Sequence, residues 1–416
     1  MQACKIHFIR MEKRIHLIFF DAGGGHRSAA NALGTVIQEQ GRSWQVEMVN
    51  LQELFDSLDV FRKVTGMRLQ DIYNTTLRKG WTLGSPQLTR AMHGVIRLYH
   101  RQQVKLLQQF WRDHPTDLVV SLIPNFNRAL FQSLRKTLPN VPLMTILTDL
   151  ADFPPHFWIE KQEQYLVCGT DRAIQQARSA GYKEDRIFRT SGMIVNPKFY
   201  ELPEIDRARG RENLGLRPDW PTGLVLFGGH GSTDMEDIAE YVSEANLKVQ
   251  LIMLCGHNTK LARRLKEMPL NFPMHVEGFT REVPRFMKLS DFFVGKPGPG
   301  SISEALCMHL PVIVEKNAWT LPQERYNADW VQERGVGLVL NNFRDIVSAI
   351  QQLLQPRMYA GMQRRVKALK NRAVFEIPEM MATVMARAAE EPAAPQVTQR
   401  KIIRKRRLPR FRKLAS

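Results

Sequence analysis

The sequence predicts an α/β fold made of two doubly wound halves, each a mainly parallel sheet covered by helices. Short apolar runs typical of buried strands alternate with helical patterns along most of the 416 residues. This alternation begins twice, because residues 15–20 and 223–227 are apolar runs that lead directly into a glycine-rich turn and a helical run. A chain of this length also exceeds one ordinary hydrophobic core, so we expect two domains.

In the first half, the apolar run 15–20 precedes the glycine turn 21–25, and a helix follows with apolar residues at helical spacing. Further strands are predicted at residues 44–49, 117–122, 142–147 and 164–168, and helices at residues 98–111, 128–138 and 170–180. The spacing of the first glycines differs from the dinucleotide fingerprint G-x-G-x-x-G, and no acidic residue follows the second strand in the usual place. We therefore do not expect NAD to bind.

The second half repeats the pattern. The strand at residues 223–227 and the turn 228–234 are followed by predicted strands at residues 249–254, 274–277, 291–294, 311–314 and 337–340. We divide the chain into an N-terminal domain (1–200), a linker (201–208), a C-terminal domain (209–355), terminal helices that brace the two domains (356–390) and a basic disordered tail (391–416).

The composition, with 44% hydrophobic and 24% charged residues, is typical of globular proteins. No apolar run reaches the roughly 18 residues that cross a bilayer, and residues 1–10 do not resemble a signal peptide. The four cysteines form neither close pairs nor metal-ligand spacings, which predicts buried thiols in the cytoplasm and no metal site: Cys4, Cys168, Cys255 and Cys307.

Positive charge is concentrated in two segments. Residues 62–112 hold ten Lys and Arg against one acid, interleaved with large apolar side chains, and residues 400–413 hold nine Lys and Arg and no acid. Cations mixed with apolar groups suit an anionic membrane surface, although a solvated helical face is the usual explanation of such runs. We find no nucleic-acid-binding motif and do not expect a nucleic-acid partner.

The glycine and proline turn at residues 295–300 connects the predicted strand 291–294 to a helix predicted to begin at Ser301. Glycines let the backbone approach a ligand, and the unpaired N–H groups of a helix start favour an anion. A purely structural turn is the alternative. Both halves open with a glycine loop, at residues 21–25 and 228–234, and a ligand between the halves would explain these two loops and the turn 295–300 together. We therefore favour a phosphate at Gly298 to Ser301.

His26 and Asp149 each follow a predicted strand of the first half and would face the same crevice. His26 could act as a general base that the helix N-terminus keeps neutral; a helix cap or a buried histidine is the alternative. Asp149 could orient an acceptor or activate its hydroxyl, or it could cap a turn. The loop after it, with His156 and Trp158, offers aromatic surface for an apolar or sugar ligand, or is an ordinary packed loop.

Three residues of the second half could bind hydroxyl groups. Gln323 and Glu324 stand together at the start of a helix, where an amide and a carboxylate suit vicinal sugar hydroxyls. Glu304, one turn into its helix, could accept from a ribose. For Glu304 and Glu324, a favourable interaction with the helix dipole is the structural alternative.

Five motifs in order resemble one family over about residues 14–341: Gly23-Gly24-Gly25-His26-Arg27-Ser28-Ala29, Cys255-Gly256-His257-Asn258, Gly278-Phe279-Thr280, Lys296-Pro297-Gly298-Pro299-Gly300-Ser301-Ile302-Ser303-Glu304-Ala305, and Pro322-Gln323-Glu324 with Asn327. They resemble the GT-B glycosyltransferases that include monogalactosyldiacylglycerol synthases, processive diacylglycerol glucosyltransferases and the lipid II-forming N-acetylglucosaminyltransferase.

The resemblance implies two Rossmann-like domains facing a central cleft, and inverting transfer of galactose or glucose from a UDP-sugar to diacylglycerol, without a metal or other cofactor. It implies His26 as base or acceptor-site residue with Asp149 beside it, Phe279 against uracil, Glu304 at the ribose, and Gln323 and Glu324 at the hexose. The diphosphate would lie at Gly298, Pro299, Gly300 and Ser301. Further donor-site residues would be Gly231, Ser232, Asn258 and Thr280, and further acceptor-loop residues Gly24, Gly25, His156 and Trp158.

Two departures from the family pattern keep alternatives open. The turn 228–232 lacks the longer continuation common in the family, which leaves the sugar donor open, and residues 155–158 replace the usual His-Pro-x-Trp, which leaves the acceptor open. The alternatives are a UDP-N-acetylglucosamine-using transferase with another lipid acceptor, a UDP-sugar epimerase, or a non-catalytic nucleotide-sugar-binding protein. The segment 62–112 falls where family members dock on membranes, so we expect a cytoplasmic protein, peripheral on the inner face of the cell membrane.

Overall fold

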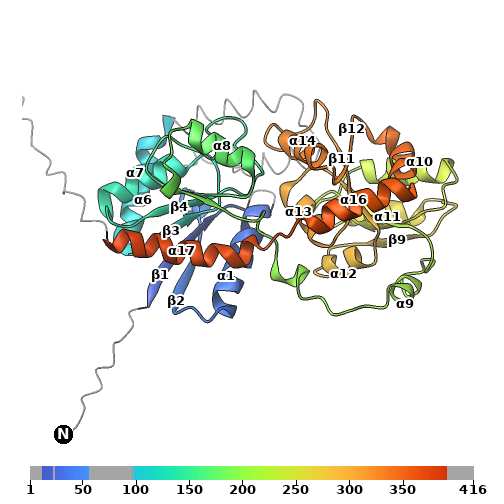
Figure 1. Ribbon diagram of the computed structural model, residues 1–416, viewed down its shortest axis with the longest axis horizontal. Helices are drawn as coiled ribbons and strands as arrows, with labels where there is room; N and C mark the ends of the chain where they lie inside the picture. The colour runs from blue at the N-terminus through green and yellow to red at the C-terminus, as the bar shows by residue number, and fades with distance from the viewer. Residues whose placement is uncertain (1–11, 22–23, 56–95, 97, 391–416) are drawn as a thin grey trace, which may run out of the picture.

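The computed structural model describes residues 12–21, 24–55, 96 and 98–390, and these contain two six-stranded sheets with flanking helices (Figure 1). Gly23, most of the basic segment 62–112 and the basic tail lie outside the described residues. Every strand pairing within the two sheets is parallel. The predicted α/β class with two doubly wound halves is confirmed.

The first sheet has the strand order β2-β1-β3-β4-β5-β6. Its strands are β1 (Lys13–Phe19), β2 (Trp44–Asn50), β3 (Leu118–Ser121), β4 (Leu143–Ile146), β5 (Tyr165–Cys168) and β6 (Ile187–Arg189). The buried residues of α1 (Gly25–Glu39) cover one face, and those of α2 (Leu51–Phe55), α6 (His100–Asp113) and α7 (Asn127–Thr137) cover the other. Helix α8 (Asp171–Ser179) packs near the β5 end. The sequence misses β6, which has three residues and no fully buried position.

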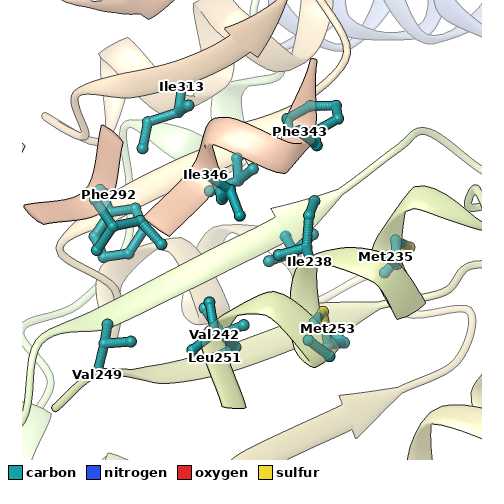
Figure 2. Close-up of a cluster of buried hydrophobic side chains, with 14 of the residues drawn as sticks. Met235, Ile238, Val242, Val249, Leu251, Met253, Phe292, Ile313, Phe343 and Ile346 are labelled. Carbon is teal, nitrogen blue, oxygen red and sulfur yellow. The ribbon is translucent and has the colours of Figure 1, made fainter. Parts of the chain in front are cut away.

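The second sheet has the order β12-β11-β10-β7-β8-β9. Its strands are β7 (Thr222–Leu226), β8 (Gln250–Leu254), β9 (Met274–Glu277), β10 (Phe292–Gly295), β11 (Val312–Glu315) and β12 (Gly337–Leu340). Figure 2 shows the core between one sheet face and α10 (Asp234–Glu244), to which α11 (Thr259–Glu267) and α15 (Ile346–Leu353) contribute. The opposite face packs against α12 (Val283–Lys288), α13 (Pro299–Cys307) and α14 (Arg325–Arg334).

The linker and the last two helices connect the halves. Helix α9 (Arg207–Glu212) begins within the predicted linker 201–208. Helix α16 (Pro356–Ala368) packs on the second sheet, whereas α17 (Ala373–Glu390) returns to the first and lies against α1 (Figure 1). At the crossing, Asn371 Nδ2 donates to the Met193 carbonyl at 2.8 Å. Both domains therefore contain chain from beyond residue 355.

Each sheet changes direction of winding at one point, between β1 and β3 in the first and between β7 and β10 in the second. In open parallel sheets, ligands bind beyond the carboxyl ends of the strands at such a point. The loops after β1, β7 and β10 are the three glycine-rich turns of the sequence prediction. The topology therefore places all three turns where a ligand is expected.

Candidate active site

His26 lies in the first turn of α1, which begins immediately after Gly24 in the left-handed conformation (φ 79°). Its Nδ1 is 3.2 Å from the Thr148 hydroxyl oxygen. Burial lowers the pKa of His26 to about 4, and a hydrogen bond with the Leu122 main chain acts in the opposite direction. The imidazole is therefore neutral at pH 7, with burial as the leading cause.

Asp149 follows β4 and is 8% exposed. Burial raises its pKa to about 7, and repulsion from Glu324 and Asp152 adds to this rise. A hydrogen bond from Trp158 and the charge of Lys296 act in the opposite direction. A carboxyl group with a pKa near 7 can accept a proton at neutral pH and hold it, as general base catalysis requires.

Trp158 is fully buried. Its Nε1 donates to Asp149 Oδ2 at 2.8 Å, and its ring centroid lies 6.0 Å from that of His26. The structure therefore supports the packed-loop interpretation at Trp158, which fixes Asp149 and offers no aromatic surface to a ligand. His156 is exposed on the same loop, and its main-chain N–H donates to Asp152 Oδ2 at 2.9 Å.

The loop after β10 presents main-chain donors at the start of α13. The helix begins at Pro299, two residues before the predicted Ser301, because proline suits the first helical position and Gly298 forms the N-cap. Proline has no N–H, and the Gly298 N–H donates to the Lys296 carbonyl at 2.8 Å. Among the described residues, the N–H groups of Gly300 and Ser301 have no acceptor. These two donors suit an anion.

Lys296 and Glu324 form an ion pair beside this loop, with Nζ 3.2 Å from Oε1. The two residues come from the loops that follow β10 and β11. A Cβ atom built on Gly298 would lie 3.7 Å from Lys296 Cε and 3.9 Å from Glu324 Oε1, so both side chains reach the N-cap of α13. Lys296 is absent from the predicted site residues, although its place directly before the glycine-proline turn is a signal for it.

Helix α14 is tied to the same loop. Asn327, fully buried, donates from Nδ2 to the Pro297 carbonyl at 2.9 Å. Gln323 directly precedes Glu324 at the start of this helix, and both side chains are half-buried. The structure thus brings Gln323 and Glu324 to the predicted diphosphate loop.

On the other side of β7, two rings stack at the ends of β8 and β9. The centroids of His257 and Phe279 lie 4.1 Å apart with an interplanar angle of 17°, and Phe279 is 60% exposed. One face of Phe279 is thus covered by an imidazole. The exposed ring can stack on a planar group such as a base.

Four predicted donor-site residues are engaged in holding these loops. Asn258 Oδ1 accepts from the Leu261 N–H at 3.0 Å, and Thr280 Oγ1 accepts from the Glu282 N–H at 3.0 Å. Ser232 Oγ donates to Asp234 Oδ2 at 2.7 Å, and Gly231 has a φ of 61° that favours glycine. These contacts shape the loops around the site.

Glu304 lies in the second turn of α13, half-buried, and burial raises its pKa to about 7. No hydrogen bond from another described residue contributes to this pKa. A hydroxyl pair of a ligand would give the carboxyl group such a hydrogen bond, which agrees with the expected contact to a ribose.

Residues of the two domains meet close to these groups. Asp149 of the first domain is within electrostatic reach of Lys296 and Glu324 of the second. The ring centroids of Phe153 and Tyr326 lie 5.7 Å apart, and Arg334 Nη2 is 3.0 Å from Asp171 Oδ2. The predicted acceptor and donor residues therefore form one candidate site between the domains.

The described residues contain neither a metal-ligand cluster nor a membrane-spanning helix. No group of three or more His, Cys, Asp and Glu side chains gathers there as metal ligands. No helix in that part of the chain combines the length and apolarity needed to span a bilayer. The cysteines within it are free thiols, with Cys168 and Cys255 buried and Cys307 half-buried.

Two family models match the chain in succession. Residues 26–195 match the model of monogalactosyldiacylglycerol (MGDG) synthase. Residues 224–376 match the glycosyltransferase family 28 C-terminal domain. The boundary between the two matches falls where the first sheet ends and the second begins.

Among curated proteins, the chain is 26% identical to the chloroplastic monogalactosyldiacylglycerol synthase of Spinacia oleracea over 387 residues, which covers 88% of this chain and 71% of that protein. It is 28% identical to a probable monogalactosyldiacylglycerol synthase of Glycine max, with 88% and 70% covered. The likeness to both plant proteins runs through both domains.

Solved structures share the fold at low identity. MurG of Acinetobacter baumannii superposes with a TM-score of 0.58 at 12% identity, covering 89% of this chain and 99% of that chain. The calicheamicin glycosyltransferase CalG4 gives 0.61 at 13% identity, covering 91% and 99%. Two facing Rossmann-like domains with this likeness define the GT-B fold. The two family models and the plant relatives identify the chain as a glycosyltransferase similar to the monogalactosyldiacylglycerol synthases.

Proposed function

We propose that the protein transfers a hexose, galactose or glucose, from a UDP-sugar to the hydroxyl of diacylglycerol with inversion at the anomeric carbon. The observation that carries this proposal is the meeting of two groups of residues between the domains. Asp149 and His26 lie on one side, and the α13 N-terminus with Lys296 and Glu324 lies on the other. The matches to MGDG synthases support the lipid acceptor.

In the proposed reaction, the acceptor oxygen attacks the anomeric carbon while the bond from that carbon to the β-phosphate oxygen breaks. The diphosphate leaves with the bonding electron pair, and the hydroxyl proton passes to Asp149. Asp149, with a pKa near 7, suits this role at neutral pH better than His26, whose pKa burial lowers to about 4. His26, hydrogen-bonded to Thr148, then positions the acceptor.

The donor is proposed to lie along the ends of β8, β9, β10 and β11. Phe279 would stack on uracil and Glu304 would accept from the ribose. The N–H groups of Gly300 and Ser301 would bind the diphosphate, with Gly298 and Pro299 shaping the turn, and Gln323 and Glu324 would bind the hexose. Backbone donors fixed in advance stabilise the charge of a leaving diphosphate at little reorganisation cost.

The protein is proposed to act at the inner face of the cell membrane as a peripheral protein. The support is charge, since the net charge is +18 and residues 62–112 and 400–413 concentrate Lys and Arg. Each cation near an anionic lipid surface contributes about 1 kcal/mol to binding.

The test is a donor and acceptor screen with the purified protein. Labelled UDP-galactose, UDP-glucose and UDP-N-acetylglucosamine are each supplied with diacylglycerol in vesicles that contain anionic lipid, and the label is followed into lipid. We expect labelled glycolipid from UDP-galactose or UDP-glucose. Transfer from UDP-N-acetylglucosamine alone would show that this sugar nucleotide is the donor instead of UDP-galactose or UDP-glucose. Conversion of a donor without a lipid product would indicate an epimerase. No reaction with any donor would refute the proposal.

A further inference from the structure

Lys296 occupies a position that no predicted role uses. It follows β10, next to the point where the second sheet changes its direction of winding. A Cβ atom on Gly228, in the loop after the adjacent strand β7, would lie 3.8 Å from Lys296 Cε, and one on Gly298 would lie 3.7 Å from the same atom. The side chain therefore runs between the two loops that flank the expected ligand position.

The ion pair of Lys296 joins an accessible cation to a shielded anion. The Lys296 side chain is 42% exposed, whereas that of Glu324 is 12% exposed. The first turn of α13 contains no acidic residue, so Glu324 is the carboxylate that a ligand at this N-terminus would meet. A diphosphate there would be repelled by Glu324 unless a cation offset that charge.

We infer that Lys296 is a further catalytic residue, whose ammonium group moves from Glu324 to the diphosphate of the bound donor and stabilises it as it leaves. This inference rests on the proposed function of the site. It also explains the pairing in the free protein. Glu324 holds Lys296 at the N-cap of α13, and once Lys296 turns to the diphosphate, the Glu324 carboxylate is released to accept from hexose hydroxyls.

The step balances without proton transfer by Lys296. The bond between the anomeric carbon and the diphosphate oxygen breaks, and its electron pair stays on that oxygen. Lys296 remains protonated throughout and offsets the added negative charge together with the Gly300 and Ser301 N–H groups. Groups of this kind each contribute roughly 10²- to 10³-fold to the rate.

The first test compares ligands that differ only in their phosphates. The variants are Lys296→Met and Lys296→Arg, and the matched control is Lys316→Met, because Lys316 also pairs with a carboxylate, Asp329, and is 36% exposed. Affinity for UDP and for uridine is measured by calorimetry. We expect Lys296→Met to weaken the binding of UDP by about tenfold or more and to leave the binding of uridine unchanged. Lys296→Arg should retain most of the UDP affinity, and Lys316→Met should match the wild type.

The second test measures hexose transfer at saturating donor, where Lys296→Met should lower kcat by about 10²-fold while Lys296→Arg loses less. Equal UDP affinity and equal kcat in Lys296→Met and wild type would overturn the inference, as would equal weakening of UDP and uridine. If Lys296→Met fails to fold, unchanged UDP affinity in Lys296→Gln would overturn it. Wild-type protein that binds UDP but transfers no hexose would refute the proposed function alone, because the UDP and uridine comparison still decides the role of Lys296.

Discussion

The two domains share a topology but have different chemistry at the same topological position. At the winding reversal of the first sheet, burial suppresses charge, since His26 is neutral and the pKa of Asp149 is raised to about 7. At the reversal of the second sheet, Lys296 and Glu324 form an ion pair, and the N–H groups of Gly300 and Ser301 have no acceptor in the part of the chain that the structure describes. One side is therefore suited to proton transfer and the other to an anion.

In both domains the fold supplies a location at the edge of the sheet, and the side chains determine the reaction. The parallel strands bring loops to one edge in both domains, but only the first domain encloses its titratable groups with a buried tryptophan. Substitutions on the first side should affect turnover and leave donor affinity unchanged, whereas substitutions on the second side should affect donor affinity and, at Lys296, turnover as well.

The largest effect is expected from Asp149→Asn, which removes the proposed proton acceptor. We expect kcat to fall by about 10²- to 10⁴-fold with UDP affinity unchanged. Calorimetry with UDP and a steady-state transfer assay measure the two quantities. A larger loss in His26→Ala than in Asp149→Asn would reassign the base to His26.

The same substitution should stabilise the fold at alkaline pH. The folded-state pKa of Asp149 is raised from 3.8 to about 7, so the unfolded chain releases this proton first and stability falls as pH rises between these two values, after which the loss stays constant. Asp149→Asn should therefore increase the free energy of unfolding at pH 8 by about 1–3 kcal/mol and change it little at pH 4. Urea unfolding at the two pH values measures this. An equal shift at both would contradict the link to ionisation.

Trp158→Phe should shift the dependence of kcat on pH to higher pH. The indole N–H that it removes holds the pKa of Asp149 down, so that pKa should rise and the ascending limb of kcat should shift to higher pH. Loss of this buried hydrogen bond should also cost about 1–3 kcal/mol of stability.

Glu324→Gln should shift the ascending limb of the kcat–pH profile to lower pH, because repulsion from Glu324 raises the pKa of Asp149. Parallel shifts in both variants would refute the assignment.

A smaller effect is expected from Phe279→Ala on the second side. Loss of a stacking ring should weaken the binding of uridine and of UDP alike, by about 1–3 kcal/mol of binding free energy, with little change in kcat at saturating donor. Phe279→Tyr, which keeps the ring, is the control. A loss confined to UDP would place Phe279 at the phosphates instead of the base.

The fold could be predicted because most strands of the two sheets in the described residues are short apolar runs. Strand β6 was missed because an edge strand with no fully buried residue lacks that signal. Trp158 could not be placed from sequence, since an aromatic residue in a proline-rich loop fits either a ligand surface or a core. Lys296 was missed because its partner Glu324 is 28 residues away in sequence, and only the packing of α14 on the β10 loop joins them.

The return of α17 to the first sheet has a consequence for synthesis and for engineering. Ile377, Met381 and Val384 of this helix complete the core that β1 and α1 begin. During translation, the first domain therefore cannot bury this face until nearly the whole described chain has left the ribosome. A fragment that ends at the last strand of the second sheet would leave the acceptor-side domain with an uncovered apolar face.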